Sequence, residues 1–210
     1  EKEIKQMLEA CRISAEALKV AGEAVEPGVS TWEIDRIARK FIESKGAIPT
    51  FLNYNGFPAA ACISINDEVI HGIPDKAHII RAGDIVSIDL GARINGYTGD
   101  NAATFACGDV SAEAKRLMET TEESLYVGIK KAVPGGRIGD ISYAVQSYVE
   151  ARGYSAVREF VGHGIGTKLH EAPEVPNFGT AGRGVRLLPG MTLAIEPMVN
   201  MGNYDVKVMP

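Results

Sequence analysis

The sequence predicts an α+β fold in which helices cover a curved, mainly antiparallel sheet, built as two halves related by a pseudo-two-fold axis. Three observations predict it. Apolar residues recur at helical spacing in four segments, alternating apolar residues and turn signals mark strands, and one half of the sequence repeats the other. The chain of 210 residues, 45% of them hydrophobic and 23% charged, is long enough for one well-packed domain.

Helices are expected in two pairs, one pair in each half. An apolar stripe at helical spacing begins at Ile4 and ends before Pro27. Ser30 with Glu33 forms a capping box that opens the second helix, and Gly46 ends it. The second pair is expected over two further segments, 111–133 and 139–152. We expect these helices to serve as cover for a sheet.

Strand signals follow the helices in each half. The expected strands are "AACISI" (60–65), "DIVSIDLGA" (84–92), "YTGDNAATF" (97–105), "TLAIEPMV" (192–199) and "YDVKVM" (204–209). Because runs of strands alternate with runs of helices, the sheet is expected to be mainly antiparallel.

The two halves repeat at an offset of 107 residues, which takes Pro27 to Pro134. The same offset aligns Asp89 with Glu196, so both halves carry a carboxylate at the corresponding position. Because two separate segments share one offset, we infer a duplicated unit. The repeated halves are about 1–107 and 108–210.

The dipeptide Asn95-Gly96 predicts a hairpin, because both residues accept the positive φ of a two-residue I′ turn. The predicted cross-strand pairs are Ile94 with Tyr97, Gly91 with Asp100, and Asp89 with Ala102. Asp89 and Asp100 therefore share one face as diagonal neighbours. Two like charges there would cost stability unless one is protonated or a cation lies between them. A divalent metal site and a pair of solvated surface aspartates both remain open.

Two histidines lie in the glycine-rich segment "GHGIGTKLHEAP". An odd number of positions separates His163 from His170, so one straight strand would send them to opposite faces. Gly164 and Gly166 permit a bend that could return both to one cavity. A lone histidine is more often a satisfied core or surface residue than a ligand. Two histidines beside the carboxylates, with Glu196 added by the repeat, favour a metal site instead.

Three of these segments, "GHGIGTKLHEAP", "SIDLGARINGYTGD" and "LAIEPMV", together resemble the methionine aminopeptidases in their shorter bacterial type I form. The resemblance extends over essentially the whole chain, with the motifs in the family's order. It implies the duplicated pita-bread fold of creatinase and the aminopeptidases, in a single catalytic domain over 1–210. It also implies a hydrolase, a dinuclear metalloexopeptidase that removes the N-terminal methionine of nascent polypeptides by a metal-bridging hydroxide.

The resemblance also implies a set of site residues. The implied metal ligands are Asp89, Asp100, His163 and Glu196, and Glu196 would also take part in proton transfer. His71, in "VIHGIP", and His170 resemble a catalytic pair that contacts the scissile peptide of the substrate. Oxygen-rich ligation with one imidazole suits two divalent ions per chain, of Mn, Fe, Co or Zn. The positions of the methionine pocket are Tyr54, Phe57, Cys62 and Leu169, the last of which is commonly aromatic in the family.

Composition narrows the classes of partner. A net charge of -5 and the lack of a dense Lys/Arg stripe argue against DNA or RNA binding. The sequence has no long apolar stretch and no signal-peptide pattern, so we expect a cytoplasmic protein that does not bind membranes. Cys11, Cys62 and Cys107 are odd in number and form no CxxC, which argues against a disulfide framework. We expect a monomer, with the ribosome as a candidate partner.

Two alternatives remain open. One is an Xaa-Pro aminopeptidase-like enzyme of the same fold, although such enzymes usually carry a large additional N-terminal domain. The other is a non-enzymatic pita-bread binding protein, although such relatives lose metal ligands that are intact here. The stretch between His170 and Glu196 is too short for the long insertion of the type II methionine aminopeptidases.

The ends of the sequence carry a separate expectation. The sequence begins at Glu1 without a methionine, and the family's second glutamate ligand would fall beyond Pro210. The repeat makes the same point, because its offset takes Asp100 to Lys207, which cannot ligate a metal. We therefore expect the C-terminal end of the catalytic domain to be incomplete. A protein ending there is expected to hold at most one metal ion tightly and to show little peptidase activity.

Overall fold

The computed structural model describes residues 1–209, which divide into two compact units. Unit 1 comprises Glu1–Ser111 and also Gly166–Leu169, and the Thr98 N–H donates to the Gly166 carbonyl over 2.8 Å. Unit 2 comprises Ala112–Ile165 and the residues from His170 onward. The division lies close to the predicted boundary between the two repeats. The single catalytic domain over the whole chain stays a prediction.

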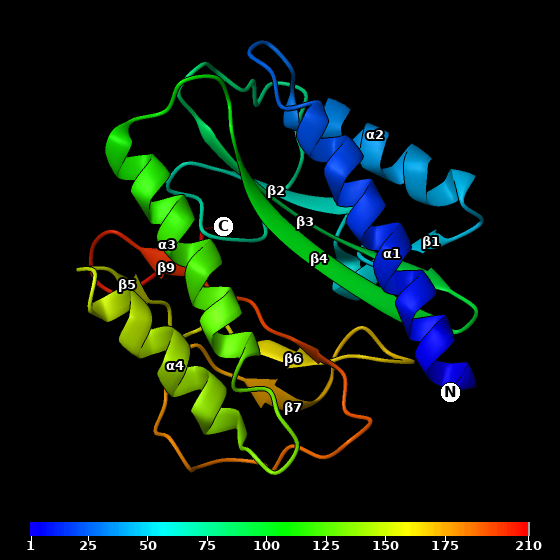
Figure 1. Ribbon diagram of the computed structural model, residues 1–210. Coiled ribbons are helices and arrows are strands. Elements are labelled where there is room, and N and C mark those ends of the chain that lie inside the picture. The colour runs from blue at the N-terminus through cyan, green and yellow to red at the C-terminus, as the bar shows by residue number, and fades with distance from the viewer. Residues whose placement is uncertain (210) are drawn as a thin grey trace. The chain divides into compact units, whose positions relative to one another are not determined.

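Unit 1 begins with two helices, α1 (Lys2–Glu23) and α2 (Thr31–Ser44), and both predicted helices are confirmed. The capping box is present, because the Glu33 N–H donates to Ser30 Oγ over 3.2 Å and the Ser30 N–H donates to Glu33 Oε2 over 2.9 Å. Figure 1 shows α1 lying across β3 and β4, and α2 contacts β1 and β2. The helices thus cover one face of the sheet.

The sheet of unit 1 is antiparallel and centred on β3. Its strands are β1 (Ile48–Pro49), β2 (Ala61–Ile65), β3 (Ile85–Ile94) and β4 (Tyr97–Ala106), and the short 3-10 helix η1 (Tyr54–Gly56) lies between β1 and β2. Strand β3 pairs with β1 and β2 and, through the hairpin, with β4. The turn residues Asn95 and Gly96 have φ of 53° and 85°, as the two-residue turn requires. All three predicted cross-strand pairs are confirmed.

The two faces of this sheet differ in polarity. Val86, Ile88 and Leu90 of β3 are fully buried in a core that the apolar residues of α1 and α2 complete. Between them, Ser87 and Asp89 point to the other face and are only partly buried. The period-2 alternation therefore leaves one face of the sheet free to carry polar groups.

The packing of α1 on β4 depends on Gly99. A Cβ at this position would lie 2.5 Å from backbone atoms of Ala10 and Cys11. We expect Gly99→Ala to lower the free energy of unfolding by about 2 to 3 kcal/mol, because the helix must move to accept the methyl group. Urea denaturation measures this. The control Gly202→Ala adds a methyl group with no atom within 4 Å, and an equal loss in both variants would contradict the prediction.

Unit 2 pairs α3 (Ala112–Ile129) with α4 (Ile138–Glu150), which lie side by side in Figure 1. Its strands are β5 (Ser155–Ala156), β6 (Gly162–Gly164), β7 (Glu171–Val175), β8 (Leu193–Ala194) and β9 (Val199–Asn200). They form a three-stranded sheet of order β7-β6-β8 and a separate β5-β9 pair. Within residues 1–209, no helix is both long enough and apolar enough to cross a bilayer.

Three predicted elements of unit 2 are wrong in extent or existence. The third helix ends at Ile129 and does not reach residue 133. The strand predicted over 192–199 is split into β8 and β9, because Pro197 has no N–H to donate to a ladder. The segment 204–209 contains no strand among the described residues. The Asn200 side chain instead donates to the carbonyls of Asn203 and Asp205, which favours a local turn.

Candidate metal and substrate site

The polar face of the unit 1 sheet carries both predicted aspartates. Asp89 lies opposite Cys62 of β2 on one side and opposite Ala102 of β4 on the other. Asp100 lies opposite Gly91, two positions along β3 from Asp89. The predicted diagonal arrangement of the two carboxylates on one face is therefore confirmed.

The electrostatics of this face follow from that arrangement. Burial raises the pKa of the Cys62 thiol, and the negative charges of Asp89 and Asp100 raise it further. Both carboxylates are thus close enough to act on one buried thiol, which stays neutral. Two ionised carboxylates on one partly buried face repel each other, and a cation between them would offset the free-energy cost of that repulsion. The donor chemistry of unit 1 fits a divalent ion.

His71 is brought to the same sheet by the residue that follows it. The Ile63 N–H donates to the Gly72 carbonyl over 2.9 Å, which places this segment along the edge of β2 that does not pair with β3. The His71 backbone has φ of 61°, a left-handed conformation that is uncommon outside glycine and clusters at functional sites. The His71 side chain is exposed, and the desolvation that the surrounding protein still imposes lowers the pKa of its imidazole, so the ring is neutral at neutral pH.

The four residues predicted to line a methionine pocket all belong to unit 1. Cys62 and Leu169 are buried, whereas Tyr54 is 37% exposed. Tyr54 and Phe57 lie on a tight loop that is closed by the Asn53 N–H donating to the Phe57 carbonyl over 2.8 Å. Asn53, which precedes Tyr54, has a positive φ. Their role as a pocket stays a prediction.

Unit 2 brings the two histidines of the glycine-rich segment together. Strand β6 ends at Gly164 after a register shift that follows His163, and the chain then turns before β7 begins. As a result, the rings of His163 and His170 pack edge to face with their centroids 4.2 Å apart. The bend predicted from the glycines is confirmed.

His163 also faces the predicted carboxylate of unit 2. Its Nδ1 lies 2.8 Å from the Gly164 carbonyl, which can only accept, so Nδ1 carries the proton. Its Nε2 lies 3.3 Å from Glu196 Oε1. A bare Nε2 and a carboxylate oxygen repel each other at this distance unless a proton or a cation lies between them. A backbone carbonyl that fixes the tautomer in this way is typical of metal-ligating histidines, so the pair fits a metal ion.

Each unit by itself thus supplies a pair of donors. Within residues 1–209, no group of three or more His, Cys, Asp or Glu side chains in either unit is arranged to hold a metal ion. Unit 1 offers two carboxylates, and unit 2 offers an imidazole and a carboxylate. Oxygen donors with a single nitrogen suit the divalent ions of the first transition row better than soft metals.

Two buried polar side chains near these residues were not predicted from the sequence. The Asn177 amide is buried and donates to the Glu196 carbonyl over 2.7 Å, which fixes the backbone of that residue. Asp35 of α2 accepts from the N–H groups of Ala60 and Ala61, immediately before Cys62. Neither partner is near in sequence, so no local pattern could have identified these contacts.

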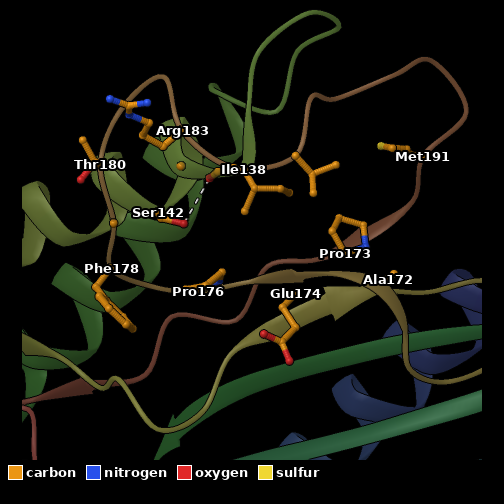
Figure 2. A pocket seen from close by; sticks show the side chains of 14 residues that line it. Ile138, Ser142, Ala172, Pro173, Glu174, Pro176, Phe178, Thr180, Arg183 and Met191 are labelled. Atoms are coloured by element: carbon orange, nitrogen blue, oxygen red, sulfur yellow. Dashed lines mark hydrogen bonds between the residues drawn. The ribbon is translucent and has the colours of Figure 1, made fainter.

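A cavity of about 590 Å³ lies elsewhere in unit 2, between α4 and β7. Figure 2 shows Ile138 and Ser142 of α4 on one side and Pro173 and Glu174 of β7 on the other. The Ser142 hydroxyl donates to the Ile138 carbonyl within the helix. None of the predicted site residues lines this cavity, so its size alone does not make it a candidate for the catalytic site.

Comparison with known proteins bears on the family. The chain matches metallopeptidase family M24 over residues 5–208. It is 54% identical over 205 aligned residues to the methionine aminopeptidase of Clostridium acetobutylicum. The aligned residues cover 98% of this chain and 82% of that relative. The methionine aminopeptidase structure from Thermotoga maritima has a TM-score of 0.97 and 41% identity, over 99% of this chain and 84% of that one. The structure of a prolidase from Pyrococcus horikoshii matches with a TM-score of 0.76 and 26% identity, over 94% of this chain and 54% of the prolidase chain.

The similarity to the prolidase bears on the fold, and the similarity to the methionine aminopeptidases bears on the family. The prolidase shares the fold, and the predicted pita-bread architecture is confirmed. The family match and the relative at 54% identity extend over nearly the whole chain. The chain belongs to metallopeptidase family M24 and, within it, to the methionine aminopeptidases of bacterial type I.

Proposed function

We propose that this enzyme removes the N-terminal methionine of nascent polypeptides, with metal ions held by Asp89, Asp100, His163 and Glu196. The observation that carries the activity is the 54% identity, over 98% of the chain, to a protein named methionine aminopeptidase. The two donor pairs described above support the ligand set, because a cation would offset the repulsion between Asp89 and Asp100 and could be held between His163 Nε2 and Glu196 Oε1, which lie 3.3 Å apart.

The proposal includes two divalent ions per chain, drawn from Mn, Fe, Co and Zn. Three carboxylates and one imidazole suit such ions. When bound, divalent ions polarise a carbonyl group and make water nucleophilic at neutral pH.

The remaining roles belong to side chains of this chain. We assign Glu196 as the acceptor of the proton released when water attacks the peptide carbonyl. His71 and His170 would contact the scissile peptide and stabilise the developing oxyanion and the leaving amine. A neutral His71, as its lowered pKa implies, can donate one hydrogen bond without carrying a charge.

The substrate side chain is assigned to Tyr54, Phe57, Cys62 and Leu169. A neutral, buried thiol and an aliphatic side chain suit a thioether, which is apolar and polarizable.

Leu169 is expected to loosen this pocket, because it stands where the family commonly has a flat aromatic wall. We expect the wild-type enzyme to accept norleucine or leucine at the first position, and Leu169→Phe to raise the preference for methionine about tenfold in kcat/KM. Competition kinetics on matched peptides measures the ratio. Leu188→Phe, at a leucine that is 56% exposed, is the control. An unchanged ratio in Leu169→Phe would remove Leu169 from the pocket.

The proposal extends to the setting of the reaction. We assign a monomeric, cytoplasmic enzyme that meets its substrates as new polypeptides, with the ribosome as a candidate partner. Co-sedimentation with ribosomes and analytical ultracentrifugation test these two points separately.

The central test is the release of free methionine from Met-Ala and Met-Gly peptides by the purified full-length enzyme. Each divalent metal is supplied in turn, and Xaa-Pro peptides serve as controls. We expect methionine release only, abolished by a chelator and restored by metal. A preference for Xaa-Pro peptides would overturn the proposal in favour of a prolidase-like activity.

A further inference from the structure

Gly72, the residue after His71, is fixed to β2 from several sides. Its N–H donates to Ser64 Oγ over 3.1 Å, and its carbonyl accepts from the Ile63 N–H over 2.9 Å. A Cβ on Gly72 would lie 2.2 Å from the Ile63 carbonyl oxygen and 2.9 Å from Ser64 Oγ, so only glycine fits. Ser64 itself is 2% exposed and cannot turn its hydroxyl to bulk water.

This attachment explains the unusual backbone of His71. A left-handed conformation at a non-glycine residue costs of order 1 kcal/mol and persists only where the surroundings enforce it. With Gly72 fixed on β2, the chain reaches the strand edge with His71 at φ 61°. Losing one of the two hydrogen bonds to Gly72 would let His71 relax toward ordinary backbone angles and would move its imidazole.

We propose that Ser64 is a positioning residue for His71, acting through the N–H of Gly72. The proposal rests on the catalytic role proposed for His71 above. The Ser64 hydroxyl holds the backbone that aims the imidazole at the substrate, and it makes no contact with the substrate itself.

The sheet offers a matched control. Ser87 of β3 lies directly opposite Ser64 in the β2–β3 register and on the same face. Its hydroxyl shares a hydrogen bond of 2.8 Å with Thr104 of β4. The two serines thus occupy one sheet and each makes one side-chain hydrogen bond, but only Ser64 bonds the segment that carries His71.

The test is a double-mutant cycle in the full-length, metal-loaded enzyme with Met-Ala as substrate. Ser64→Ala is expected to lower kcat about tenfold and to leave KM and metal content nearly unchanged, because a misplaced catalytic group loses turnover before binding. In a His71→Ala background, Ser64→Ala is expected to have no further effect on kcat. Ser87→Ala is expected to keep the wild-type kcat.

Three results would overturn the proposal: a wild-type kcat in Ser64→Ala, an equal fall in both backgrounds, or an equal loss in Ser87→Ala. If Ser64→Ala does not fold, Ser64→Cys replaces it in the cycle, since a thiol has a similar shape and is a weaker acceptor. A wild-type enzyme that releases no methionine would instead refute the proposed function, so the two failures are distinguishable.

Discussion

His71→Ala is expected to lower turnover of Met-Ala by about 10² while metal content stays nearly unchanged. The backbone segment that carries His71 runs along β2, the strand on which Cys62 lies opposite Asp89, but His71 is not among the proposed ligands. Steady-state kinetics and metal analysis of the same preparation test both parts. Loss of metal together with activity would make His71 a ligand.

A second variant separates the imidazole from its backbone. Asparagine tolerates left-handed angles better than alanine does, and His71 has φ of 61°. We therefore expect His71→Asn to lose as much turnover as His71→Ala and to be the more stable of the two on thermal unfolding. If His71→Asn kept most of the turnover, His71 would contribute to catalysis through its backbone conformation and not through its imidazole ring.

The same histidine sets an expectation for pH. Desolvation lowers the pKa of His71 below its ordinary 6.5, so the ring is neutral above that pH and gains a proton only in more acidic solution. Any acidic limb that His71 contributes to the pH–rate profile should therefore lie below pH 6.5. That limb should be missing from the profile of His71→Asn.

The sequence predicted best where the structure depends on local chemistry. The Asn95-Gly96 turn determines the register of its hairpin by itself, so the shared face of Asp89 and Asp100 followed from counting residues. The capping box at Ser30 is similarly local. The family resemblance came from short motifs whose order and spacing are visible in the chain, and the comparisons confirm it.

The sequence predicted less where distant groups decide the structure. Alternation alone predicted a single strand over 192–199, but Pro197 interrupts the ladder between β8 and β9. The tie between Ser64 and Gly72 joins a strand to a loop, and nothing in the local pattern distinguishes that serine from Ser87. The roles of the site residues do not follow from the fold, because knowing which groups share a face of the sheet does not determine what those groups bind.

The largest effect is expected from Asp89, for which activity and stability should move in opposite directions. Asp89 and Asp100 share one face of the β3–β4 hairpin, and both act on the Cys62 thiol. Without metal, Asp89→Asn removes the repulsion between them, so we expect the metal-free protein to become more stable by about 1 kcal/mol. With metal, the variant should lose methionine release by about 10³ or more, because a ligand is gone.

Thermal unfolding with and without metal separates these effects. At a hundredfold excess over Kd, metal should stabilise the wild type by about 3 kcal/mol, because it binds only the folded state. That gain should be largely absent in Asp89→Asn. Asp109→Asn, at an exposed aspartate beyond β4, removes the same charge and should behave as the wild type in both conditions. If Asp89→Asn kept the metal-dependent gain, the two carboxylates would be solvated surface groups, the alternative that their sequence pattern left open.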